Sequence, residues 1–111
     1  MITIEKLKVF GADTETALAR CMGKEDFYLK LVGMGLNEPR FEELGTVLEA
    51  KDYDKAFEHC HSLKGVIGNL ALEPLYKEIC EMTELLRTKT DMDYSNHYKK
   101  IMDMRKELLN L

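Results

Sequence analysis

The feature that most constrains the fold is a long apolar stripe over residues 53–70. Apolar side chains recur there at intervals of 3, 1, 3, 3, 4 and 3 residues, which is the period of an α-helix. The stripe consists of Tyr53, Ala56, Phe57, Cys60, Leu63, Ile67 and Leu70. Asp52 precedes it and is a suitable N-cap. Because an amphipathic helix is stabilised mainly by packing of its apolar face, the rest of the chain must cover this stripe.

The remaining sequence predicts further helices, because no segment alternates as a strand would. Helix caps, prolines and glycines mark the expected boundaries. The first expected helix begins at Asp13 or Thr14 and ends at Cys21, with Gly23 as its stop, and the second covers residues 24 to 33 or 36. A third helix follows Pro39, the stripe helix is the fourth and is capped by Asp52, and a fifth begins at Pro74. Residues 88–93 are expected to form a polar loop, and the last helix covers residues 94–110. The expected inward residues outside the stripe are Phe27, Tyr28, Leu31 and Met34, then Phe41, Leu44 and Leu48, then Leu75, Ile79, Met82 and Leu86, and finally Tyr98, Ile101, Met104 or Arg105, and Leu108.

Short connections favour antiparallel neighbours, so we predict an all-α fold, an antiparallel four-helix bundle with additional short N-terminal helices. The 111 residues are expected to form a single domain, 1–111, because that length suits one ordinary core. Abundant Leu, Glu, Lys, Met and Ala, with two prolines, agree with a helical chain.

Composition and charge exclude several classes of function. The formal net charge of -4 comes without a basic patch, so we expect neither nucleic-acid nor membrane binding. Charged residues interrupt the N-terminal segment, which therefore lacks the apolar core of a signal peptide. The three cysteines, Cys21, Cys60 and Cys80, are widely spaced and predict buried, reduced thiols. These features predict a cytoplasmic protein, and Met1 favours a free-standing chain over a piece of a larger one.

Two glycines inside the stripe helix require an explanation, because each costs about 1 kcal/mol relative to Ala in a helix interior. At about 100° per residue, Gly65 and Gly68 lie on the same face as His61, just off the apolar stripe. Lys64 is a neighbour of His61 three residues on, whereas His59 lies about 200° away. One interpretation is that the glycines clear space for an anion at His61. The alternative is that they allow close helix packing and that His61 is an ordinary surface residue.

The sequence contains no pattern that indicates a metal site or an enzymatic active site. His59 and His61 are two residues apart and point away from each other on a helix, so they cannot share an ion. His97 is remote from both, and methionines at helical spacing are typical core residues. There is no Gly-rich phosphate loop and no nucleophile elbow. We therefore expect no metal, no bound cofactor and no autonomous enzymatic activity.

The stretch around His61 resembles the signature of the histidine-containing phosphotransfer (HPt) family. That signature is His, any residue, Leu, Lys, Gly, three variable residues, Asn, Leu. The matching positions are His61, Leu63, Lys64, Gly65, Asn69 and Leu70. The chain departs from the family pattern in three places. Cys60 stands where Ala is frequent, and Ala71 stands where Gly is usual. Val66 and Ile67 are bulky where the variable residues are usually small, but the helical rotation directs them away from His61.

The resemblance implies a phosphorelay intermediate that carries a phosphoryl group on His61, on Nε2, between receiver-domain aspartates. Lys64, Gly65 and Gly68 would form the phosphate environment, and Leu63, Asn69 and Leu70 would be structural. Such proteins do not bind ATP, are expected as monomers, and rely on Mg²⁺ supplied by the receiver. The implied partners are response-regulator receiver domains and a hybrid sensor kinase.

Two other functions were weighed against this one. A helical interaction module of the same shape could bind receiver domains or other signalling proteins without being phosphorylated, and the departures at Cys60 and Ala71 leave room for it. The dimerising domain of a sensor kinase is disfavoured, because its motif usually has an acidic residue and then a proline where Ser62 and Val66 stand.

Overall fold

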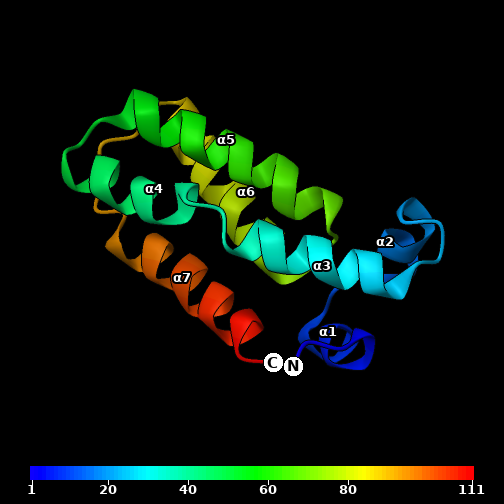
Figure 1. Ribbon diagram of the computed structural model, residues 1–111. Helices are drawn as coiled ribbons and strands as arrows, with labels where there is room; N and C mark the ends of the chain where they lie inside the picture. Colours follow the sequence, from blue (N-terminus) through cyan, green and yellow to red (C-terminus); the bar gives the residue numbers. More distant parts are fainter.

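The computed structural model describes residues 1–111 as seven α-helices joined by short connections, as Figure 1 shows. The helices are α1 (Ile4–Phe10), α2 (Thr14–Arg20), α3 (Glu25–Leu36), α4 (Arg40–Glu49), α5 (Tyr53–Asn69), α6 (Glu73–Arg87) and α7 (Ser95–Leu109). The prediction of an all-α chain is confirmed. None of these helices combines the length and the apolar character that crossing a membrane would require.

The stripe helix, α5, lies at the centre of the packing. Its N-cap is Asp52, whose carboxylate accepts a hydrogen bond from the backbone N–H of Lys55. The stripe faces inward as predicted, and its members Ala56, Cys60, Leu63 and Ile67 are fully buried. The predicted inward residues of α6 are buried as well: Leu75, Ile79, Met82 and Leu86.

From α4 to α7, consecutive helices pack side by side and run in opposite directions. Helix α5 packs against both α4 and α6, and α7 packs against α6 and α3. Figure 1 shows α4, α5, α6 and α7 alternating in direction, while α3 and α4 follow one another along one side of the molecule. The short helices α1 and α2 lie beyond the C-terminal end of α5 (Figure 1). The outer face of α5 therefore stays uncovered along much of its length.

The predicted inward face of α3 is wrong in two positions. Phe27 and Met34 are 49% and 62% exposed, whereas the buried positions of α3 include Tyr28 and Val32. Gly35 lies on the buried face, where an added Cβ would lie 2.6 Å from the Leu70 side chain, and Tyr28 on the same face donates a hydrogen bond to the Leu70 carbonyl. A glycine at this point lets α3 approach the end of α5 closely, and this approach rotates Phe27 and Met34 toward solvent.

The N-terminal segment contains one helix that the periodicity did not assign. Helix α1 is capped by Thr3, whose hydroxyl accepts from the Lys6 N–H, and it ends at Gly11 with a positive φ of 115°. The predicted helix after Asp13 is present as α2, with the Asp13 carboxylate accepting from the N–H of Thr16. Ile4, Leu7 and Phe10 are spaced by three residues and pack against the core, but the period extends over only seven residues, which is too short to identify a helix from the sequence alone.

Four helices end on a left-handed residue that is not glycine. Met22, Lys51, Ala71 and Lys89 have φ values between 52° and 57°. Each follows a helix in the Schellman arrangement, with the next residue's N–H bonded back to the last turn, as Gly23 to Leu18. A side chain in this conformation costs about 1–2 kcal/mol, which glycine avoids. These helix ends therefore carry backbone strain that single substitutions can relieve.

Met22 provides a test of this strain, because its side chain is 84% exposed and leaves the core unchanged when removed. We expect Met22→Gly to raise the free energy of unfolding by about 0.5–1 kcal/mol, measured by urea denaturation. The matched control is Met34→Gly, which makes the same change at an exposed position inside α3. There glycine should lower stability by about 1 kcal/mol. A loss of stability in both variants would contradict the strain at Met22.

Candidate functional site

His61 stands on the outer face of α5 with an exposed imidazole. Its ring stacks on the ring of Phe57, one turn earlier, with centroids 5.8 Å apart and planes inclined by 16°. The guanidinium carbon of Arg87 lies 5.0 Å from the centroid of the same Phe57 ring. Phe57 therefore supports one flat face of the imidazole and restricts its rotation.

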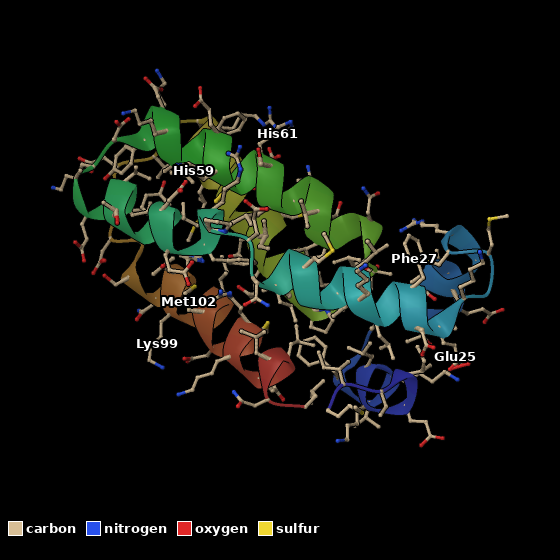
Figure 2. All side chains as sticks on the ribbon, in the orientation of Figure 1. Glu25, Phe27, His59, His61, Lys99 and Met102 are labelled. Atoms are coloured by element: carbon tan, nitrogen blue, oxygen red, sulfur yellow. The ribbon has the colours of Figure 1, made fainter.

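His59 lies on the opposite flank, as the helical rotation predicts. Its ring is directed toward α4, where Nδ1 lies 3.3 Å from Arg40 and Nε2 lies 3.8 Å from a Glu43 carboxylate oxygen. Figure 2 shows His59 between α5 and α4, and His61 on the outer side of α5. His59 is thus engaged within the fold, whereas His61 is presented to solvent.

An open hollow of about 450 Å³ adjoins His61. One cation, Lys64, comes from the same helix, and a second, Arg20, comes from α2. The residues that line the hollow are Arg20, His61, Lys64, Gly65, Gly68, Asn69, Glu73 and Tyr76. The structure therefore brings together the predicted residues His61, Lys64, Gly65, Gly68 and Asn69.

The two glycines of α5 have different roles. A Cβ added at Gly65 would meet no atom within 4 Å, so Gly65 leaves open space beside the histidine. A Cβ at Gly68 would lie 2.8 Å from the ring of Tyr76 on α6. Gly68 therefore allows Tyr76 to lie against α5. The clearing interpretation fits Gly65, and the helix-packing alternative accounts for Gly68.

Arg20 holds the end of α5. Its Nη1 donates to the backbone carbonyls of Gly68 and Asn69, at 3.1 and 3.0 Å. These carbonyls belong to the last turn, where the helix dipole is negative and a cation is favourable. The contact joins residues 48 and 49 positions apart, so no local pattern in the sequence marks it. Arg20 was not among the predicted site residues, and neither were Glu73 and Tyr76.

Two further motif residues, Leu63 and Leu70, have structural roles. Both are buried in the core, and the Leu70 carbonyl accepts a hydrogen bond of 2.8 Å from the Tyr28 hydroxyl. These contacts fix the last turns of α5 and its junction with α3. Asn69 ends α5, where its side chain is exposed and lines the hollow.

Two of the departures from the family pattern have local structural explanations. Cys60 is fully buried, and burial raises the pKa of its thiol to about 12. It is therefore a small core residue with no thiolate at neutral pH, despite its place beside His61. Ala71 occupies the left-handed position after α5, with a φ of 57°, where the usual glycine would be unstrained. Its N–H still bonds to the Gly68 carbonyl, so the helix ends in a regular way.

A larger cavity of about 690 Å³ lies away from this site. It is lined by the end of α4, the start of α5 and the connection to α7, including Leu48, Tyr53 and Tyr98. None of the predicted site residues reaches it. This cavity is larger than the hollow beside His61, but the exposed imidazole and the two cations lie at that hollow.

Comparison with known protein families, curated proteins and solved structures finds no match to this chain.

Proposed function

We propose that this protein is a histidine-containing phosphotransfer protein of a multistep phosphorelay, with His61 as the phosphoacceptor. The observation that carries the proposal is the pairing of an exposed, stacked imidazole with two cations around an open surface. A phosphoryl group carries about -1.5 to -2 charge at neutral pH. Lys64 and Arg20 border the hollow where such a group would lie.

The proposed chemistry is a transfer between two side chains. The Nε2 lone pair of a neutral His61 imidazole attacks the phosphorus of an aspartyl phosphate on a receiver domain. As the N–P bond forms, the P–O bond to the aspartyl group breaks, and its electron pair leaves on the carboxylate. The Nδ1 proton stays on the ring. Transfer to a second receiver reverses these bonds, so positioning and charge compensation dominate the catalysis.

The finer features of the proposal follow the resemblance. In the four-helix bundle of the family, α3 and α4 together would take the place of one helix, because they follow one another along one side, and α5, α6 and α7 would be the other three. Helices α1 and α2 would be the additional N-terminal helices. The protein would act as a cytoplasmic monomer, without ATP binding or kinase activity of its own. A receiver domain would supply the Mg²⁺ and close its own pocket over His61. The uncovered outer face of α5 suits such an approach (Figure 1).

The test is incubation of the protein with a receiver domain that carries labelled phosphate on its aspartate. We expect acid-labile, base-stable label to appear on this chain within minutes and to be lost again to a second receiver. Calorimetry, run in parallel, measures binding of the receiver and distinguishes phosphotransfer from binding without transfer. A receiver that binds but transfers no label would identify the non-phosphorylated interaction module and overturn the proposal.

A further inference from the structure

A second polar cluster lies between α6 and α7 and shares no residue with the hollow beside His61. Glu78 and Glu81 are three residues apart on α6, so their side chains lie on neighbouring positions of one face. His97 joins them from the first turn of α7. One ligand atom from each residue lies within 4.8 Å of the other two. Two carboxylates and an imidazole therefore converge on one point from two helices.

Two polar atoms of this cluster are buried without a hydrogen-bond partner: Oε2 of Glu78 and Nδ1 of His97. The imidazole Nδ1 lies 4.0 Å from Oε1 of Glu81, which is too long for a hydrogen bond. Buried polar atoms in native proteins nearly always have a partner. Each orphaned atom is a potential electron-pair donor, and a cation that it ligates would supply the partner that it lacks.

The chemical types of the three ligand atoms indicate which cation the cluster would bind. Carboxylate oxygen and imidazole nitrogen are normal ligands of Zn²⁺, at about 2.0–2.2 Å. Tetrahedral ligands at that distance lie about 3.4 Å apart, so the cluster must contract by about 1 Å. Glu81 can supply this movement because its side chain is 57% exposed. The two carboxylate charges would also balance a dication in a partly buried place.

We propose that Glu78, Glu81 and His97 form a binding site for a divalent transition-metal ion, best suited to Zn²⁺. The three side chains would be the protein ligands, and the open side at Glu81 would admit a water molecule as the fourth. The ion would link α6 to α7. Because the ligands come from two helices that separate on unfolding, the ion would stabilise the folded chain.

The test is titration of chelator-treated protein with Zn²⁺ alone, followed by calorimetry. We expect one ion per chain with a dissociation constant of about 10 µM or tighter. His97→Gln and Glu81→Gln should each weaken binding at least tenfold, which corresponds to about 1.4 kcal/mol. Glu81 is mostly exposed, so its variant should fold even if His97→Gln does not.

The matched control is His59→Gln, because the two histidine side chains are similarly exposed, 17% and 20%, and each lies beside a glutamate. His59 differs in having Arg40 at its other ring nitrogen, which repels a cation. Its replacement should leave Zn²⁺ affinity within twofold. Absence of stoichiometric binding at about 1 mM Zn²⁺, or equal affinity in wild type and Glu81→Gln, would overturn the proposal.

Cobalt provides a second measurement on the same protein. Co²⁺ should produce visible absorption of a four-coordinate site, and Zn²⁺ should raise the melting temperature of the wild type but not of Glu81→Gln. An equal rise in the melting temperature of both proteins would place the ion elsewhere and reject this site.

Discussion

His61→Gln is expected to take up no acid-labile phosphate from a phosphorylated receiver domain, whereas His59→Gln should be labelled as well as the wild type. Glutamine keeps polarity and much of the side-chain length but has no nucleophilic ring nitrogen. The measurement is label retained on the chain after gel separation, with acid and base treatment to identify phosphohistidine. The expected loss is complete, because no other histidine stands at the hollow.

The controls for this experiment follow from the structure. His61 is exposed, so its replacement should change the free energy of unfolding by less than about 0.5 kcal/mol. Calorimetric binding to the receiver should persist in His61→Gln, which shows that the docking surface is intact. Label that survives in His61→Gln would rule out this residue as the phosphoacceptor.

Gly65→Gln is expected to raise the stability of the folded chain and to slow phosphoryl transfer. An added side chain at Gly65 meets no atom within 4 Å, so the variant should gain about 0.5 kcal/mol from helix propensity alone. The same side chain would stand one turn from the imidazole of His61 and obstruct the approach of a receiver. Because misplacement of reacting groups by about 1 Å can cost on the order of 100-fold, we expect a 10- to 100-fold slower transfer.

Gly33→Ala in α3 is the matched control, because a Cβ there also meets nothing within 4 Å and the residue lies far from His61 in the sequence. It should raise stability by about 1 kcal/mol and leave the transfer rate unchanged. Stopped-flow transfer and urea denaturation on the same preparations give both quantities. A Gly65→Gln protein that transfers phosphate at the wild-type rate would show that the open surface at position 65 has no part in docking.

Periodicity was sufficient to predict the all-helical class and much of the buried core. The stripe of α5 and the inward residues of α6 are dense and regular, so their burial followed from the helical period. Helix α3 was less predictable, because Phe27 and Met34 satisfy the same period as Tyr28 and Val32. The inward face of α3 contacts Leu70 through Gly35 and through the Tyr28 hydroxyl, and both contacts depend on a residue far away in the chain.

The candidate site was predictable only in part, for a similar reason. His61, Lys64 and Gly65 belong to one helix, where rotation places them together without any tertiary information. Tyr76 enters from α6 and explains Gly68, and Arg20 enters from α2. The ligands of the proposed metal site could not be predicted from the sequence either. Glu78 and Glu81 have the pattern of solvated residues on a helix surface, and only the fold shows that His97 lies beside them.

The hydrogen bonds from Arg20 to the end of α5 make the hollow a composite of two distant parts of the chain. His61 and the rest of its motif lie within ten residues, but one of the two cations that line the hollow, Arg20, comes from the separate helix α2. A change at position 20 can therefore retune how strongly the hollow attracts an anion while every motif residue stays the same. If His61 carries a phosphoryl group as proposed, a substitution at this one remote position would change the lifetime of the phosphohistidine without changing the motif.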